Sequence, residues 1–338
     1  MKKFTKILLI GCLLVTVSCN NWLDVDPKSQ VKDKDLFASE MGFKEALSGV
    51  YSLMTKEALY GKELTFGWLG VLGQEWTSVP YNYEDDQKYD FENAASEVRI
   101  DSVWTGLYNA IANANKLLKE LEGKENLFSG DNYFIIKGEV LALRAYLHFD
   151  LLRIFGASCT VGMERIAIPY VTEYAPTIFP QEKVGDFVGK VLKDLQDAAK
   201  CLENDPILTG RTVSEIDDNG YLMNRQVHLN YYAVKGLMAR VYLYKGDYAN
   251  AEVCAKEVIG SGWVKQENLT NESVADLTFS TEHLFALNIV TLGNIVDKYL
   301  DGGNNSFALE ESRLSEYYGS SYDYRYLYLF KTGVGMSN

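Results

Sequence analysis

Residues 138–156 read GEVLALRAYLHFDLLRIFG, and this stretch decides the fold. No helix breaker lies between its two terminal glycines, and its apolar residues recur at spacings of three and four. Such spacing places side chains on the faces of a 3.6-residue helix. Because there are two apolar stripes, we expect the central helix of a helical array, covered on two sides. The stripes are Val140, Leu143, Leu147, Leu151 and Ile154, and Leu141, Ala145, Phe149, Leu152 and Phe155.

A second stretch, residues 231–262, supplies a packing partner. Small Ala239 is followed three residues later by Tyr242, then by a turn around Gly246, and then by Ala251. This is the spacing of a tetratricopeptide (TPR) helix pair, in which small residues let two helices approach closely. The repeat is degenerate, because Ala255 stands where a bulky aromatic residue is usual.

These patterns predict a mainly α fold, a TPR-like helical-repeat scaffold with irregular loop insertions and a few short strands. Helical spacing extends over about residues 34–262. The whole chain is 47% apolar, which is enough to form a sizeable core. The segment 157–181 contains three prolines, so we expect it to be extended. Alternation around Phe285, Leu287 and Ile289 predicts a strand.

The first residues, MKKFTKILLIGCLLVTVSC, are a processing segment rather than part of the fold. A basic start precedes an apolar run that is too short to span a bilayer in a mature protein. The segment resembles a bacterial lipoprotein signal over residues 1–18, in which Cys19 is acylated and becomes the mature N-terminus. The alternatives are an ordinary signal peptide and an uncleaved anchor.

The charge of the chain excludes one class of partner. Its formal net charge is −13, and removing residues 1–18 takes away three lysines and leaves 30 basic against 46 acidic residues. Such an acidic protein repels polyanions, so nucleic acid is not an expected partner. No later segment approaches the ~18 apolar residues that a spanning helix requires, so the mature chain is expected to be held at the membrane by its N-terminal lipid.

The remaining cysteines, Cys159, Cys201 and Cys254, do not have the even count or short spacing of a disulfide framework. An exported protein could still pair two of them. Because Cys201 and Cys254 lie within helical patterns, we expect buried thiols there.

No catalytic or metal-binding motif stands out. The three histidines are far apart, and His148 lies one helical turn after Arg144, where a packed, hydrogen-bonded role is expected. Arg144 and Arg153 are expected to form ion pairs. The segment from Glu215 to Gly220 imitates the start of a calcium loop but departs from it in the first and last ligands, which favours a polar turn. We therefore predict no enzyme, no cofactor and no metal.

Residues 61–96 combine glycines and a proline with many aromatic side chains. A sugar ring has an apolar C–H face and polar hydroxyls, so flat aromatics beside amides and carboxylates suit a glycan. The structural alternative is that the tryptophans attach the loop to the scaffold, since large aromatics dominate burial. The candidate ligand-binding residues are Trp76, Tyr81, Tyr83, Asn82, Glu75, Gln74 and Trp68.

Several segments together resemble the SusD/RagB family of nutrient-binding outer-membrane lipoproteins. They follow the family's order over roughly residues 19–290. The segments are WLDVDP after Cys19, LRAYLHFDLLRIFG, IAIPYVTE, KDLQDAAKCL and ARVYLYKGDYANAEVCAKEVI. Family members are usually longer, so the chain resembles a C-terminally truncated member whose region 263–338 is incomplete.

The resemblance implies one SusD-like domain, residues 19–338, on the outer membrane and facing the cell exterior. It implies ligand contacts in the aromatic insertion and a SusC-like TonB-dependent channel as partner. We therefore expect a lipoprotein that binds oligosaccharide or polysaccharide and delivers it to that channel. The alternatives are a RagB-like peptide-binding uptake component, a TPR-type adaptor that holds another protein and, last, a glycoside hydrolase.

Overall fold

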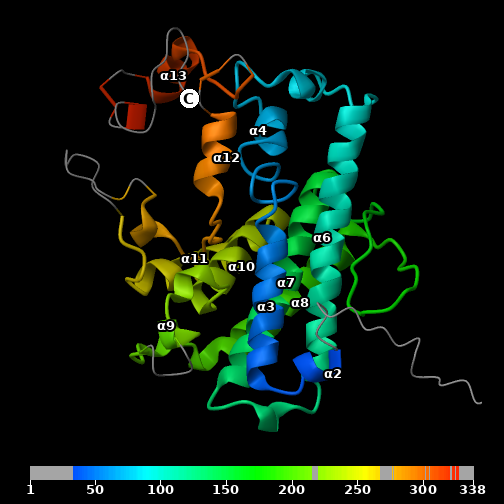
Figure 1. The fold of residues 1–338 in the computed structure, drawn as a ribbon, viewed down its shortest axis with the longest axis vertical. Helices are drawn as coiled ribbons and strands as arrows, with labels where there is room; N and C mark the ends of the chain where they lie inside the picture. The colour runs from blue at the N-terminus through cyan, green and yellow to red at the C-terminus, as the bar shows by residue number, and fades with distance from the viewer. Residues whose placement is uncertain are drawn as a thin grey trace, which may run out of the picture.

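The chain forms an array of helices packed around α7 (Asn132–Phe155), as Figure 1 shows. The computed structural model describes residues 33–214, 220–266, 276, 278–300, 302–303, 305–319, 322–323 and 325–326. These residues are mainly helical and contain no β-sheet, which confirms the predicted mainly α fold. The other α-helices are α2 (Asp33–Leu36), α3 (Glu40–Met54), α4 (Trp68–Leu72), α5 (Glu84–Gln87), α6 (Ala94–Leu121), α8 (Val184–Cys201), α9 (Pro206–Thr209), α10 (Tyr231–Lys245), α11 (Tyr248–Gly260), α12 (Leu292–Tyr299) and α13 (Glu311–Tyr318). The 3₁₀ turns are η3 (Tyr81–Tyr83), η4 (Glu125–Leu127), η5 (Leu202–Asn204), η7 (Arg225–Val227) and η8 (Ser280–Glu282).

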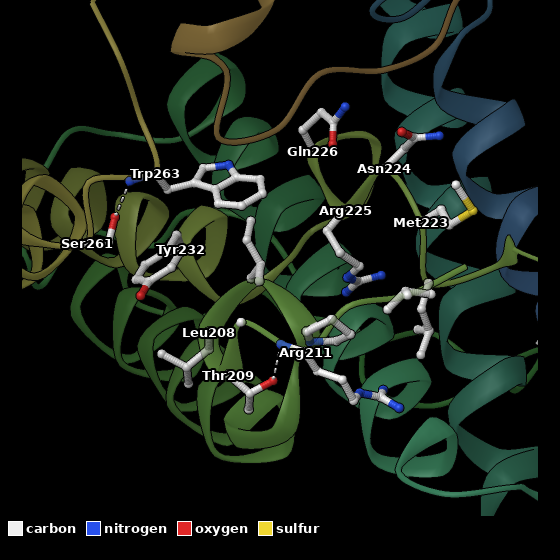
Figure 2. Close-up of a pocket in the computed structure, with 15 residues that line it drawn as sticks. Leu208, Thr209, Arg211, Met223, Asn224, Arg225, Gln226, Tyr232, Ser261 and Trp263 are labelled. Atoms are coloured by element: carbon white, nitrogen blue, oxygen red, sulfur yellow. Dashed lines mark hydrogen bonds between the residues drawn. The ribbon is translucent and has the colours of Figure 1, made fainter. Parts of the chain in front are cut away.

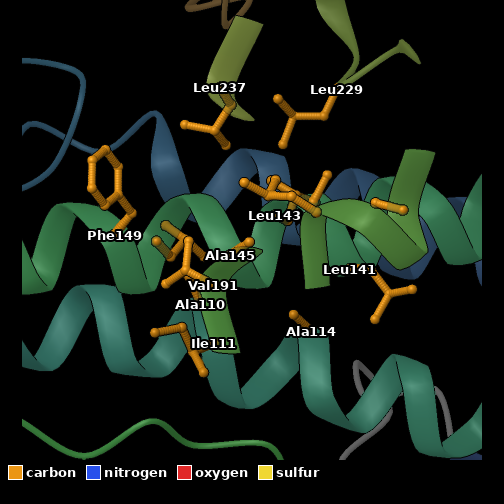
Figure 3. Packing of buried hydrophobic residues seen from close by; sticks show 14 of the residues in the cluster. Ala110, Ile111, Ala114, Leu141, Leu143, Ala145, Phe149, Val191, Leu229 and Leu237 are labelled. Carbon is orange, nitrogen blue, oxygen red and sulfur yellow. The ribbon is translucent and has the colours of Figure 1, made fainter. Parts of the chain in front are cut away.

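The central helix α7 is covered on all sides. It packs against α6 and α8 and also touches α3 and α10, and 18 of its 24 residues are buried. Figure 3 shows its apolar side chains between those of α6 and those of α8 and α10. Burial of one large aliphatic side chain stabilises a protein by roughly 1.5–3 kcal/mol. The two apolar stripes of this helix therefore pack against helices on more than one side, as predicted for a central helix.

The TPR-like pair is formed by α10 and α11, which pack on each other. Gly246 ends α10 with φ +83°, a left-handed conformation that favours glycine. The next residue, Asp247, caps α11 by accepting a hydrogen bond from the Asn250 backbone N–H at 3.2 Å. Ala239 and Ala251 are half-buried against the core.

The strand predicted around Phe285 and Ile289 is wrong. This segment has no partner strand among the described residues, and the Ala286 backbone N–H donates instead to the Gln226 carbonyl at 2.9 Å. Phe285 packs on the ring of Tyr51, so its apolar residues cover helices and not a sheet. The described chain has only the isolated bridges Ser78–Ala308 and Ile166–Lys183 in place of the predicted short strands.

Some predictions fall outside the described residues. They are the signal segment 1–18, the acylated Cys19, and residues 215–219 of the calcium-like segment. Within the part that is described, no helix has both the length and the apolar character needed to cross a bilayer.

Helix α7 approaches the C-terminal end of α8 closely at Gly138. A Cβ atom at this position would lie 2.7 Å from the Leu202 Cγ and 3.1 Å from the Ala198 carbonyl oxygen. Gly138→Ala should therefore overpack the interface and lower the free energy of unfolding by about 1–3 kcal/mol, measured by urea denaturation.

The matched control is Gly189→Ala on α8, where a Cβ would meet nothing within 4 Å. Alanine favours a helix by up to about 1 kcal/mol over glycine, so this control should stabilise the protein slightly. Equal effects of the two substitutions would show that α7 and α8 do not approach closely at Gly138.

Candidate functional site

The aromatic insertion, residues 61–96, lies at the end of the array where α4 stands in Figure 1. It consists of consecutive tight turns, then α4, η3 and α5, and it leads into α6. Its turns are closed by backbone hydrogen bonds such as that from the Gly67 N–H to the Lys62 carbonyl, at 2.8 Å. The insertion is therefore a folded unit whose side chains have defined positions.

A buried charge cluster attaches the insertion to α6. The Arg99 guanidinium pairs with the Asp86 carboxylate and lies 3.7 Å from the Glu63 Oε2. Glu63 also accepts a hydrogen bond of 2.8 Å from the Tyr83 hydroxyl, and Asp86 accepts one of 3.2 Å from the Trp68 indole N–H. Because an unpaired buried charge is strongly unfavourable, these partners hold each other in place.

Phe307, far along the chain, completes the insertion. Its ring is fully buried and packs on the rings of Trp76 and Tyr83, with centroids 5.6 and 5.0 Å apart. Beside it, the Ala308 backbone N–H donates to the Ser78 carbonyl at 3.0 Å and its carbonyl accepts from the Ser78 N–H. The site surface is thus built from two segments that are distant in sequence.

Two of the predicted ligand residues lie in the core. Trp68 is 3% exposed and Tyr83 is 1% exposed. The Tyr83 ring lies against the Arg99 guanidinium, whose central carbon is 3.8 Å from the ring centroid. Trp68 and Tyr83 therefore attach the insertion to the helical scaffold, which is the structural alternative to a ligand-binding role for the tryptophans. Both rings are too buried to contact a ligand.

Two further predicted residues are partly engaged in the structure of the insertion. Trp76 is half-buried, and its indole N–H donates to the Phe66 carbonyl at 2.7 Å. Gln74 has φ +55°, and its side-chain amide donates to the Gln87 carbonyl at 2.8 Å. Trp76 is therefore only partly exposed, and the Gln74 amide nitrogen is already used.

The other three predicted residues face solvent. Tyr81 is 76% exposed and the next residue, Asn82, is exposed, while Glu75 is exposed on the far side of residues 76–80, which are half-buried or buried. The Tyr81 backbone N–H donates to the Asn305 side chain at 2.9 Å, so its main chain is fixed while its ring is open to solvent. The insertion therefore offers an exposed aromatic ring and amide at residues 81–82 and an exposed carboxylate at Glu75.

Sequence reasoning missed the residues that support this surface. Phe307 and Asn305 lie more than 200 residues from their partners and follow no periodic pattern. Tyr89, another aromatic residue of the insertion, is not among the candidate ligand-binding residues. It is exposed, has φ +60°, and its hydroxyl donates to the Leu72 carbonyl at 3.0 Å.

On α7, His148 is packed and hydrogen-bonded, as predicted. It is fully buried, its Nδ1 lies 2.8 Å from the Arg144 carbonyl, and its Nε2 accepts from the Val171 backbone N–H at 2.9 Å. These partners require the proton on Nδ1, and burial lowers the pKa of His148 to about 3. Arg144 forms the predicted ion pair, bonding both carboxylate oxygens of Asp194 at 2.7 Å.

A second buried cluster was not predicted. Arg225 donates to Glu139 at 2.6 Å and to both carboxylate oxygens of Asp205, at 3.0 and 2.9 Å. His228 lies 2.9 Å from the other Glu139 oxygen. Burial opposes the charge on Glu139, but Arg225 and His228 outweigh it and lower the pKa of that carboxyl to about 2. Arg225 lies at the start of η7, in the connection between α9 and α10.

The described residues hold no disulfide and no metal cluster. Cys159, Cys201 and Cys254 are unpaired; Cys254 is buried, as predicted, whereas Cys201 is only half-buried. No group of three or more His, Cys, Asp or Glu side chains in the described chain is arranged to hold a metal ion.

Comparisons with known proteins agree with the helical array. Residues 21–243 match the SusD-like family, which is described as "Starch-binding associating with outer membrane". A SusD-like protein of Formosa agariphila is 24% identical over 266 residues, which is 77% of this chain and 47% of that protein. The chain thus spans about half the length of this relative.

Solved structures show the same fold. A SusD superfamily protein from Bacteroides thetaiotaomicron superposes with TM-score 0.67 at 20% identity, covering 88% of this chain and 65% of that one. A SusD-like carbohydrate binding protein from Bacteroides vulgatus gives TM-score 0.67 at 16% identity, covering 88% and 62%. A laminarin-binding SusD-like protein gives TM-score 0.51 at 21% identity, covering 68% and 45%.

The Glu139 cluster predicts an acid-sensitive fold. The folded pKa of about 2 lies below the ordinary value of 4.5, so this carboxylate stabilises the protein above about pH 4.5. That stability is lost as the pH falls from 4.5 toward 2, where the unfolded chain binds the proton first. Glu139→Gln should lower stability at pH 7 and flatten the fall in this window, as measured by urea denaturation at several pH values. An unchanged slope in the variant would contradict the assignment.

Proposed function

Since the chain belongs to the SusD-like family, described as starch-binding in association with the outer membrane, we propose that it is a non-catalytic glycan-binding lipoprotein of the cell surface. It passes an oligosaccharide or polysaccharide to a SusC-like TonB-dependent channel. The family match supports a glycan as the ligand. The exposed segment around Tyr81 supports the proposal that the glycan binds there.

The main observation in favour of this binding site is that the Tyr81 ring is exposed while its backbone is held in place. The ring is open to solvent while the Tyr81 N–H is held by Asn305, so little conformational freedom is lost when a ligand stacks on it. Asn82 and Glu75 add hydrogen-bonding groups for sugar hydroxyls, and Trp76 of the same insertion is half-buried. Trp68 and Tyr83 support the surface from below.

Proteins of the same fold support a glycan as the ligand. One solved neighbour is described as a laminarin-binding SusD-like protein, and another as a SusD-like carbohydrate binding protein. For this chain a polysaccharide is therefore the first ligand to test, with starch and laminarin as the first two probes.

The anchor has its own test. If Cys19 is acylated, wild-type protein partitions with membranes, and Cys19→Ala is released or left unprocessed. Two or more acyl chains hold a protein on a membrane far better than one. Normal processing of the variant together with equal membrane association would rule out the lipid anchor.

The contact surface is tested by Tyr81→Ala, assayed by affinity electrophoresis in gels that contain a polysaccharide. By analogy with bases that stack on aromatic side chains, loss of one stacking ring should weaken binding by about 1–3 kcal/mol. Because the ring is exposed, the melting temperature should stay unchanged. Tyr81→Phe keeps the ring and should retain most of the binding.

The matched control is Tyr248→Ala, since this tyrosine is 70% exposed at the start of α11, away from the insertion. Retention should be unchanged in the control. If Tyr81→Ala binds like wild type, the insertion is not the contact surface. If wild type binds peptides and no polysaccharide, the RagB-like function replaces this one, and shortening of the polymer during the assay would reveal a hydrolase.

A further inference from the structure

A pocket of about 590 Å³ lies on a different part of the molecule from the insertion. It opens between α9, the segment that precedes α10, and the residues that follow α11. In Figure 1, α9 is at the lower left and α4 at the top, so the two surfaces belong to different ends of the array. The volume lies within the range of small-ligand sites.

Two aromatic side chains form one wall of this pocket. Figure 2 shows Trp263 above Tyr232, on the side opposite Met223 and Asn224. Trp263 is 43% exposed, and its backbone N–H donates to the Ser261 hydroxyl at 3.1 Å, which fixes the main chain beside the ring. Large rings at the surface with a polar edge are typical of ligand contacts.

The polar groups of the pocket are amides, hydroxyls and a guanidinium. The Gln226 backbone carbonyl accepts from the Ala286 N–H, and the side chains of Gln226 and Asn224 lie at the edge of the pocket. Arg211 is exposed and makes no ion pair with any described residue. Although the chain has 46 acidic residues, the described residues that line the pocket include none.

The floor of the pocket is rigid because it rests on the Glu139 cluster. Arg225 reaches from the pocket into the core, where Glu139 and Asp205 hold it. Asp205 also caps α9, accepting from the Ile207 N–H at 3.1 Å, and it accepts from the Tyr231 N–H at 3.2 Å at the start of α10. One carboxylate thus positions both helices that border the pocket, so the site is formed before a ligand arrives.

We propose that this pocket is a second glycan-contact site, which takes a sugar unit of the same polysaccharide. The apolar face of the sugar ring lies on Trp263 and Tyr232, and its hydroxyls bond the amides of Asn224 and Gln226 and the Arg211 guanidinium. The site rests on the proposed function, because a glycan is the ligand class of the family. Two sites on one chain raise the avidity for a long polymer over that for a short oligosaccharide.

The experiment begins with a panel of laminarin, starch, xylan, mannan and pectin in affinity gels, using the full chain. The polysaccharide that retains wild type most strongly supplies the oligosaccharide for hydrogen–deuterium exchange. The expected result is ligand-induced protection in two places, the insertion around residues 77–83 and the pocket segments 206–213 and 222–226.

Trp263→Ala should remove the protection of the pocket segments, keep that of the insertion, and weaken polymer retention about tenfold, within the range for loss of one stacking ring. Trp263→Phe keeps a flat ring and should restore most of both signals. Tyr248→Ala is the exposed aromatic control and should match wild type. Circular dichroism and the melting temperature show whether each variant is folded.

The outcomes separate the two proposals. Protection confined to the insertion, with Trp263→Ala equal to wild type, overturns the pocket site and leaves the proposed function in place. Protection of the pocket that Trp263→Ala removes supports the pocket site. If no member of the panel retains wild type, the proposed function fails and the pocket site fails with it.

Discussion

The buried contact between Glu139 and Arg225 is the constraint on which much of the structure depends. Both side chains are almost fully removed from water, and the atoms that join them are 2.6 Å apart. An isolated buried charge is far less stable than one in water, so neither residue can take this position alone. Glu139 belongs to the central helix and Arg225 to the connection before α10. Their pairing therefore fixes where that connection lies on the array.

Other polar side chains along α7 hold neighbouring parts of the array in the same way. Arg144 pairs with Asp194 of α8, and His148 accepts from the backbone of the extended connection. Asp150 accepts a hydrogen bond of 2.8 Å from Tyr60, at the start of the insertion. The apolar residues of this helix pack against the other helices, while Glu139, His148 and Asp150 bind the irregular segments and Arg144 binds helix α8. Helix α7 thus positions both candidate glycan-binding surfaces.

The sequence predicts the helices better than the site, and the reason is physical. Periodicity is local, so it identified α7, the α10–α11 pair and the packed role of His148. It cannot show which distant residue fills a gap, so Phe307 and Arg225 were missed. The apolar residues around Phe285 alternate with other residues as in a strand, because one side of this extended segment packs on helices. Aromatic content marked the insertion, but only contacts distinguish buried Tyr83 from exposed Tyr81.

The most direct test of this account is a double-mutant cycle between Glu139 and Arg225, measured by urea unfolding at pH 7. The cycle compares Glu139→Gln, Arg225→Met and the double variant with wild type. Contacting residues in one buried network couple by about 0.5–3 kcal/mol, and we expect a value in the upper half of that range. Single effects that add to within about 0.5 kcal/mol would contradict the claim that this pair holds the loop on the central helix.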